Sequence, residues 1–314
     1  MLDLLFWLLV FVVSMFILVK ASDYFIESAK AIKDFFNISS FIIGVTLVSI
    51  GTSLPELVSS LIATIEKSSE IVAGNVVGSN IANILLVLSM AAIFGKKLKL
   101  EYKMVHIDLS FLLTATFFAY ISLMDGIFTL AEGLFCLFFA IIYIAYLREA
   151  QIIYSSDIKD GKEKKEKPWK LFFIFISSAV LLYIGAKYVV ESVIMLSNLL
   201  SIGKDIIAVT AVAFGTSLPE VAVSVNAARK KLYEIAIGNV MGSNIFNILL
   251  VLGISSLVSS LIITQNIITL ALPMMLVSTL LFLFIIWDKS MTRWEGLMMF
   301  ILYLFFILRI SGII

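Results

Sequence analysis

The stretch GTSLPE stands at residues 51–56 and again, unchanged, at residues 215–220. At the same offset of 164 residues, 28 of the 47 positions in 43–89 are identical to their counterparts in 207–253, without a gap. A match of this length does not arise by chance, even in a biased composition. The chain therefore contains an internal duplication, and its fold is expected to consist of two equivalent halves.

The composition places the chain in a membrane. Hydrophobic residues make up 61% of the 314 residues and charged residues 14%, whereas soluble domains carry about 25% charged residues. A soluble fold of this size could not bury so much apolar side chain. The net charge of +1 argues against nucleic acid as a partner. A single cysteine, Cys136, and a single histidine, His106, exclude an internal disulfide framework and most histidine chemistry.

Ten runs of apolar residues are long enough to cross a bilayer, which takes about 20 residues of helix. We therefore expect an all-α integral membrane protein with ten transmembrane helices. The predicted spans are 2–22, 41–65, 70–94, 104–123, 126–147, 169–192, 205–228, 234–257, 267–287 and 294–310.

Each copy of the duplication holds five of these spans. The first five-helix repeat covers 1–147, with its most similar block (α-repeat 1) at about 41–94, and the second covers 169–314, with α-repeat 2 at about 205–257. Because five is odd, the second copy must enter the membrane from the opposite side. This predicts an inverted-topology repeat with a site near the midplane between the halves. The hydrophilic stretch 148–168 is expected to join the repeats as a charged linker.

The distribution of positive charge predicts the orientation of the spans. Eighteen Lys and Arg residues lie on the side of the loops that follow odd-numbered spans, and three lie on the other side. We expect a multi-pass protein of the cell membrane with extracellular N- and C-termini and a cytoplasmic linker at 148–168. The lipid bilayer is a necessary partner, and no obligatory protein partner is evident.

A carboxylate lies near the middle of two equivalent spans, Glu56 in the second and Glu220 in the seventh. An ionisable side chain at that depth costs about 2.5–3.5 kcal/mol even on the lenient insertion scale, so it marks a functional site by default. No Lys or Arg at mid-depth of the neighbouring spans neutralises these acids. Pro55 and Pro219 each remove a backbone donor beside them and predict broken helices whose freed carbonyls line a cavity.

Neutral oxygen ligands accompany each carboxylate at helical spacing. They are Thr52 and Ser53 in the second span, Thr216 and Ser217 in the seventh, the stripe Asn75, Ser79 and Asn83 in the third, and its copy Asn239, Ser243 and Asn247 in the eighth. The glycines of GNVVGSN at 74–80 and GNVMGSN at 238–244 have GxxxG spacing, which allows another helix to approach closely. Hard oxygen ligands with two negative charges suit one Ca²⁺ or two Na⁺ ions better than zinc or copper.

These motifs resemble the two α-repeats of the cation/calcium exchanger superfamily, and most closely those of the prokaryotic sodium/calcium exchangers. The resemblance extends over essentially the whole chain. It implies a secondary antiporter, not an enzyme, that exchanges Na⁺ for Ca²⁺ by alternating access. The long first and sixth helices would move across a core of the other eight. It implies no cofactor, because Ca²⁺ and Na⁺ bind as substrates.

The resemblance also implies roles for single residues. Calcium ligation is implied for Glu56, Glu220, Thr52 and Thr216, and sodium ligation for Ser53, Ser217, Ser79, Ser243 and the backbone carbonyls of Ser49 and Ala213. Asn83 matches an amide of the family's first repeat. Asn247 departs from the pattern, because well-known sodium/calcium exchangers often carry an aspartate there. The site then has two charges instead of three, which leaves the sodium stoichiometry and the driving ion open.

Three other functions share part of this pattern. A proton/calcium antiporter would use the same fold, with the glutamates themselves taking protons. A cation channel is the second alternative, although inverted broken helices around a buried acidic pair favour a carrier. An intramembrane hydrolase would need a base for Ser53 or Ser217, and His106 lies near a membrane edge.

A charged stripe follows the first apolar run. Its members are Lys20, Asp23, Glu27, Lys30 and Asp34, which recur at helical spacing. The stripe predicts a solvated or cavity-facing surface, and a gating role for Glu27 and its counterpart Glu191 is the alternative.

Overall fold

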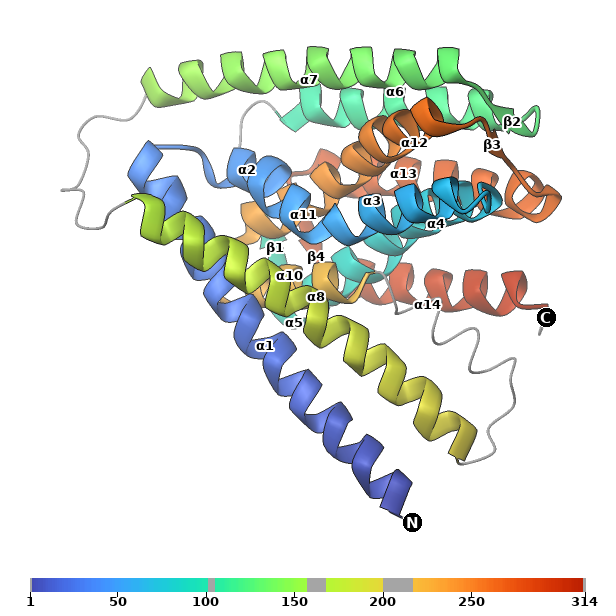
Figure 1. The fold of residues 1–314 in the computed structure, drawn as a ribbon. Coiled ribbons are helices and arrows are strands. Elements are labelled where there is room, and N and C mark those ends of the chain that lie inside the picture. The colour runs from blue at the N-terminus through green and yellow to red at the C-terminus, as the bar shows by residue number, and fades with distance from the viewer. Residues whose placement is uncertain (1, 101–104, 157–167, 200–216, 313–314) are drawn as a thin grey trace.

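The computed structural model describes residues 2–100, 105–156, 168–199 and 217–312, and this part of the chain is almost entirely helical (Figure 1). The α-helices are α1 (Leu2–Phe36), α2 (Ser40–Ile43), α3 (Ser49–Ile65), α4 (Glu70–Ala82), α5 (Leu88–Gly95), α6 (Val105–Leu123), α7 (Leu130–Ser156), α8 (Pro168–Leu199), α10 (Leu218–Arg229), α11 (Tyr233–Phe246), α12 (Gly253–Val258), α13 (Leu272–Trp287) and α14 (Arg293–Ile310). Wide π-helical turns continue several of them: η1 (Gly44–Val48), η2 (Asn83–Val87), η3 (Asn247–Leu252) and η4 (Ile267–Ala271).

Within the described residues, eight helical segments are long and apolar enough to cross a membrane. They are Asp3–Phe36, Ser40–Ile65, Glu70–Gly95, His106–Leu123, Leu130–Ile152, Pro168–Leu196, Tyr233–Val258 and Ile267–Trp287. Two predicted spans are not among them. The span 205–228 begins outside the described residues, and the span 294–310 corresponds to α14, whose 18 residues include Arg293, Glu295 and Arg309. The total of ten spans therefore stays a prediction.

Two helices are longer than the sequence analysis predicts. The first span, predicted at 2–22, belongs to a helix of 35 residues that ends at Phe36. The sixth, predicted at 169–192, belongs to α8, which has 32 residues. In the first case the charged stripe does not end the helix, because its members lie along one side while buried apolar residues such as Phe25 and Ile26 continue on another.

Four short strands, which the sequence analysis did not predict, join the two halves. They are β1 (Lys97–Lys99), β2 (Ile127–Phe128), β3 (Leu261–Ile262) and β4 (Ser290–Thr292). In the antiparallel β1–β4 pair, Lys97 lies opposite Thr292, and in the antiparallel β2–β3 pair, Phe128 lies opposite Leu261. The offset of 164 residues converts the first pairing into the second. Reciprocal pairing of this kind is what a two-fold axis between the halves produces.

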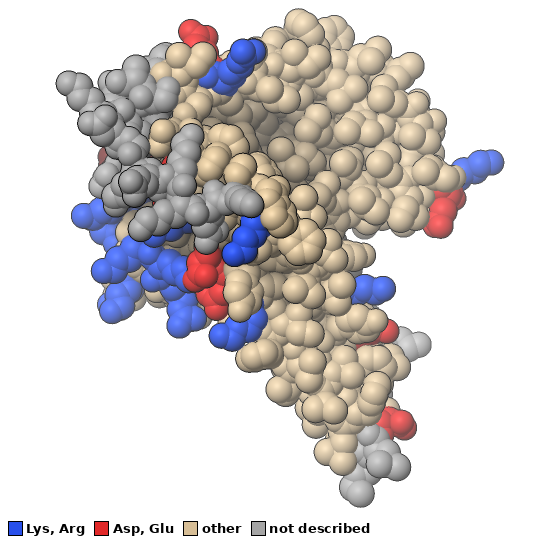
Figure 2. Space-filling model, turned by 60° about the vertical axis from the view of Figure 1, so that its left-hand side comes forward, with Lys and Arg blue, Asp and Glu red and all other residues tan. Residues whose placement is uncertain are grey.

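The centre of the molecule is formed by the spans that contain α4 and α11, of which 83% and 94% are buried. The glycines of α11 permit this packing: a Cβ on Gly238 would lie 2.7 Å from the Phe41 carbonyl oxygen, and one on Gly242 would lie 2.7 Å from Ser49 Cβ. The predicted close helix approach is thus present for α11. Figure 2 shows broad areas without charge on the outer surface and a cluster of Lys and Arg at one edge, which is typical of a membrane protein.

Candidate ion-binding site

Glu56 of α3 and Glu220 of α10 lie together in the interior. Their side chains are 2% and 1% exposed, and the two carboxylates interact electrostatically. The Ser53 hydroxyl donates a hydrogen bond to Glu220 Oε1 at 3.2 Å, which joins the first GTSLPE stretch to the second. Glu56 Oε2 and Glu220 Oε2 are buried and have no hydrogen-bond partner among the described residues. Buried oxygen atoms of this kind are suited to ligate a cation.

The polar residues of α3 reach the interior because they share one face of the helix. Thr52, Ser53 and Glu56 are all buried. On the opposite face, Leu54 and Val58 are 44% and 52% exposed. The helix therefore turns its polar side toward the protein and its apolar side outward, as a helix in lipid must.

Two asparagines from the predicted polar stripes, Asn75 and Asn239, make the same interhelical hydrogen bond in the two repeats. The Asn75 amide donates to Ser60 Oγ at 3.0 Å and ties α4 to α3. At the equivalent positions, the Asn239 amide donates to Ser224 Oγ at 2.9 Å and ties α11 to α10. The Thr52 hydroxyl, at 3.1 Å, donates to Asn239 Oδ1. These bonds hold the residues that frame the two glutamates.

The remaining members of the stripes bring further oxygen atoms. Ser79, Ser243, Asn83 and Asn247 are each at most 4% exposed. Their side-chain oxygen atoms have no hydrogen-bond partner within the described part of the chain. The Asn83 amide donates at 3.1 Å to Asn244 Oδ1, so that the third and eighth predicted spans are bonded across the repeat interface.

The other predicted ligands are placed in part. Ser217 is buried and precedes α10 as its N-cap residue. The Ser49 carbonyl, predicted to bind Na⁺, accepts a hydrogen bond from the Thr52 hydroxyl at 3.3 Å. Thr216 and Ala213 lie outside the described residues, so their assignment stays a prediction.

The predicted break beside Pro55 is wrong for the first repeat. The helix α3 runs without interruption from Ser49 to Ile65, with Pro55 inside it. A proline removes one backbone hydrogen bond, a loss that the packed surroundings of this helix tolerate. Gly51, four residues before Pro55, packs closely against α1, because a Cβ there would lie 2.9 Å from the Phe25 ring. In the second repeat, Pro219 lies in the first turn of α10, where proline is compatible with a helix start.

Two further features of the site were not predicted from the sequence. Asn83 and Asn247 each begin a π-helical turn, at equivalent positions of the two repeats. Such turns are rare and often lie at functional sites. In addition, Asn80 and Asn244 are buried, and Asn80 Oδ1 and Asn244 Nδ2 have no partner among described residues. The identical GSN tripeptides of the two repeats were the available signal for these two residues.

A cavity of about 560 Å³ reaches the site from one side. Ser79 and Ser217 line it together with Asn75, Gly78 and the aromatic Tyr303. The cavity connects site oxygen atoms with space outside the packed core.

The donor atoms of the site are all oxygen atoms, from carboxylate, hydroxyl and amide groups. In the described part of the chain, no three or more His, Cys, Asp or Glu side chains lie together in a group that could hold a metal ion.

A known protein family matches the chain over most of its length. The model described as "Sodium/calcium exchanger protein" matches residues 6–148 and again residues 170–312. The chain belongs to the sodium/calcium exchanger protein family. The second matched segment begins and ends 164 positions after the first, which is the offset of the duplication.

Curated relatives of this family member cover nearly its full length. It is 37% identical to the sodium/calcium exchanger MaX1 of Methanosarcina acetivorans, over 95% of this chain and 97% of the relative. It is 36% identical to the uncharacterized membrane protein MJ0091 of Methanocaldococcus jannaschii, over 94% of each chain. The inner membrane protein YrbG of Escherichia coli is 31% identical, over 89% of this chain and 88% of that protein.

Solved structures agree with the fold of this family member. The sodium-calcium exchanger NCX_Mj, in a structure soaked with 10 mM Na⁺ and zero Ca²⁺, superposes with a TM-score of 0.81 at 30% identity. The match covers 96% of this chain and 98% of the other. The protein is therefore a multi-pass, helical membrane protein with the fold of a sodium-calcium exchanger. Of the proteins compared, MaX1 and NCX_Mj are named as sodium/calcium exchangers.

Proposed function

We propose that this protein is a secondary antiporter that exchanges Na⁺ for Ca²⁺ across the cell membrane by alternating access. The observation that carries the proposal is the buried pair of Glu56 and Glu220, one from each repeat, each with a carboxylate oxygen atom that has no hydrogen-bond partner among the described residues. Two negative charges match one Ca²⁺, and the neutral oxygen atoms around them complete a set of hard ligands. The named functions of the relatives support the same conclusion.

The proposal includes the topology. Ten spans form two inverted five-helix repeats, so that the ions bind between the halves at mid-depth. The reciprocal pairing of β1 with β4 and of β2 with β3 supports a two-fold relation between the repeats. The excess of Lys and Arg on one side supports extracellular termini and a cytoplasmic linker at 148–168.

Competition for the same carboxylates provides the coupling. When Ca²⁺ leaves, two uncompensated charges remain in a low-dielectric interior, and such a site resists crossing the membrane empty. Binding of Na⁺ neutralises Glu56 and Glu220 and permits the return step. Ser53, Ser79 and Ser243 supply neutral oxygen atoms for Na⁺ without adding charge. Ca²⁺ and Na⁺ cannot occupy the two carboxylates at the same time. Each ion therefore crosses only in exchange for the other, and neither leaks alone.

Uptake of ⁴⁵Ca²⁺ tests the proposal. Proteoliposomes are loaded with Na⁺ and diluted into Na⁺-free buffer, and a parallel sample receives a pH gradient in place of the sodium gradient. We expect uptake that requires internal Na⁺. Uptake driven only by the pH gradient would assign the protein to proton/calcium antiport on the same fold. No uptake under either gradient would refute calcium as the substrate.

A further inference from the structure

The helices α1 and α8 form a pair that stands apart from the other helices (Figure 1). Only 17% of the α1 span and 33% of the α8 span are buried. The two helices nevertheless pack tightly on each other. A Cβ on Gly185 would lie 3.0 Å from the Leu18 backbone nitrogen, and the Phe25 and Phe175 rings stack with their centroids 4.4 Å apart. A pair with close mutual contact and a small face toward the core is suited to move as one body.

Ion pairs and amide hydrogen bonds join α1 to the C-terminal end of α10. Lys230, just after α10, places Nζ 3.0 Å from Asp23 Oδ1 and 2.9 Å from Glu27 Oε1. The Asn226 amide donates to Ser22 Oγ at 3.0 Å and to Asp23 Oδ1 at 3.1 Å. Burial lowers the pKa of Lys230, but the hydrogen bonds and charges of Glu27 and Asp23 outweigh it and raise the pKa above its usual value. The ammonium group is therefore charged at neutral pH.

We call Lys230, Asp23 and Glu27 the first set. The equivalent positions of the other repeat form a second set in which the charges of the long helix and the core are reversed. At the offset of 164 residues, Asp23 corresponds to Lys187 and Lys230 corresponds to Glu66. In the first set, the long helix carries the acid and the base follows the core helix. In the second set, the long helix carries the base and the acid follows the core helix α3. Either arrangement allows an ion pair between a long helix and the core.

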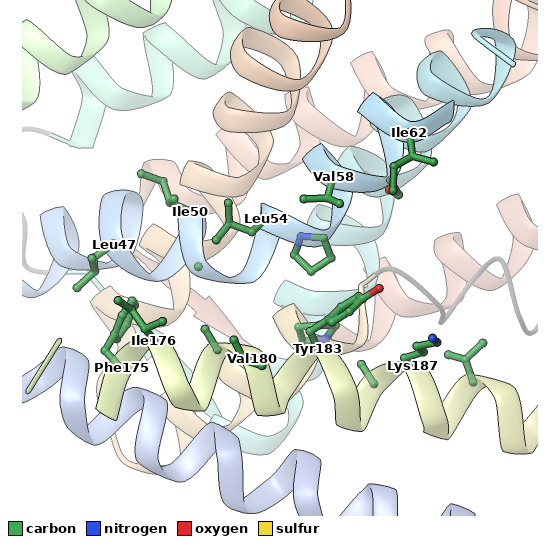
Figure 3. Close-up of a pocket in the computed structure, with 17 residues that line it drawn as sticks. Leu47, Ile50, Leu54, Val58, Ile62, Phe175, Ile176, Val180, Tyr183 and Lys187 are labelled. Atoms are coloured by element: carbon green, nitrogen blue, oxygen red, sulfur yellow. The ribbon is translucent and has the colours of Figure 1, made fainter. Parts of the chain in front are cut away.

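In the structure, the second set is open. Lys187 and Glu66 are both exposed and do not form an ion pair with each other. A cavity of about 610 Å³ lies between α3 and α8, and Ile62 and Lys187 line it from the two sides (Figure 3). Ile62 is the counterpart of Asn226. In the second set, the cavity therefore takes the place of the hydrogen bonds that Asn226 donates to α1 in the first set.

We propose that these two sets are alternating latches of the α1/α8 pair: Lys230 with Asp23 and Glu27 holds one end state, and Lys187 with Glu66 holds the other. The inference rests on the proposed antiport by alternating access. Movement of the pair that closes the cavity between α3 and α8 brings Lys187 to Glu66 and separates Lys230 from α1. The latches contact no transported ion and act only on the position of the two long helices.

The two latches differ in strength. Asn226 donates two hydrogen bonds to α1, whereas Ile62 has no polar group to offer to α8. The state with the first latch closed is therefore favoured at rest, and Asn226→Ile should shift the population toward the second latch.

Cross-linking tests the second latch. Glu66→Cys and Lys187→Cys are combined in a Cys136→Ala background and treated in proteoliposomes with a short bis-thiosulfonate reagent. We expect the cross-link to form and to lower Na⁺-dependent Ca²⁺ uptake about ten-fold or more, because it holds one end state. Reduction should restore uptake to the level of the untreated double variant, and the reagent should not change the uptake of either single-cysteine variant. Asn226→Ile should increase the yield of the cross-link.

Two outcomes would overturn the second latch. One is the absence of the cross-link in Na⁺, in Ca²⁺ and without either ion. The other is a cross-linked protein that still transports. The cross-link is detected by mass spectrometry and does not depend on transport. If it forms while the Cys136→Ala parent takes up no Ca²⁺ under any gradient, the proposed antiport fails and the latch between two conformations stands.

Charge reversal tests the first latch. Lys230→Glu should slow exchange about two- to five-fold, the range expected for a partly exposed ion pair. Adding Asp23→Lys should restore the rate to within about two-fold of the parent. Asp34→Asn is the matched control, because Asp34 pairs with Lys33 at 2.9 Å on its own helix, and it should leave the rate unchanged. An equal loss in the single and double variants would contradict the latch.

Discussion

Ser53 and Glu220 are 167 positions apart in the chain, and the hydroxyl of the first donates to the carboxylate of the second at 3.2 Å. This bond links the two copies of GTSLPE, so neither repeat holds a complete site. A bond from a neutral hydroxyl to a buried carboxylate stabilises the ionised acid and orients its oxygen atoms. The proposed ion site therefore lies where the two copies of the motif meet.

Removing either carboxylate charge should abolish calcium transport. Glu56→Gln and Glu220→Gln keep the side-chain volume but leave one charge for a divalent ion, so we expect Ca²⁺ uptake to fall about 100-fold or more. The variants should still elute as folded protein in detergent and melt near the parent temperature. Glu70→Gln, at the exposed start of α4, is the control and should transport normally. Robust uptake in either site variant would refute the assignment of that glutamate.

Loss of the Ser53 hydroxyl should weaken sodium binding more than folding. Ser53→Ala removes the bond to Glu220, and hydrogen bonds to charged groups contribute about 1.5–3 kcal/mol. We expect the Na⁺ concentration for half-maximal exchange to rise about ten-fold. Ser59→Ala is the matched control, because within the described ranges the Ser59 hydroxyl donates only to the Glu56 carbonyl of its own helix, at 3.1 Å. Sodium dependence that is identical in the two variants would remove Ser53 from the site.

Equivalent glycines of the two repeats should differ in their tolerance of a methyl group. A Cβ on Gly242 would lie 2.5 Å from Ser49 Oγ, whereas a Cβ on Gly78 has no described atom within 4 Å. Gly242→Ala should therefore destabilise the protein by about 1–3 kcal/mol, and Gly78→Ala should have little effect. Thermal melting in detergent measures both. A Gly242→Ala protein as stable as the Gly78→Ala protein would contradict the close packing of α11 against α3.

Exchange should move net charge. Expelling Ca²⁺ against a 10⁴-fold gradient at 100 mV, inside negative, requires about 10 kcal/mol, and each Na⁺ entering down a ten-fold gradient releases about 3.7 kcal/mol. Three Na⁺ ions suffice and two do not, so we expect one net positive charge to enter per cycle. The reversal potential of ⁴⁵Ca²⁺ flux in liposomes with potassium-clamped voltage measures this, with Glu56→Gln as the inactive control. A flux that does not respond to voltage would exclude the three-sodium cycle.

Some expectations failed where a long-range contact overrode a local pattern. Pro55 predicts a break, yet α3 continues through it, because the polar side of the helix, with Thr52 and Glu56, is packed in the interior. Asp23 and Glu27 follow the predicted end of the first span, yet α1 continues to Phe36. Their charges are met by Lys230 from α10, a partner that no pattern within the first 36 residues indicates.

The amino-acid sequence by itself determined the membrane location, the duplication, the two acidic residues and the oxygen chemistry around them. These properties follow from composition, from a fixed offset and from helical spacing, which depend only on neighbours along the chain. Only the tertiary structure decided that Ser53 meets Glu220, that β1 pairs with β4, and that one latch is closed while its counterpart is open. The physical reason is that periodicity identifies which face of a helix is buried, but not which distant helix packs against that face.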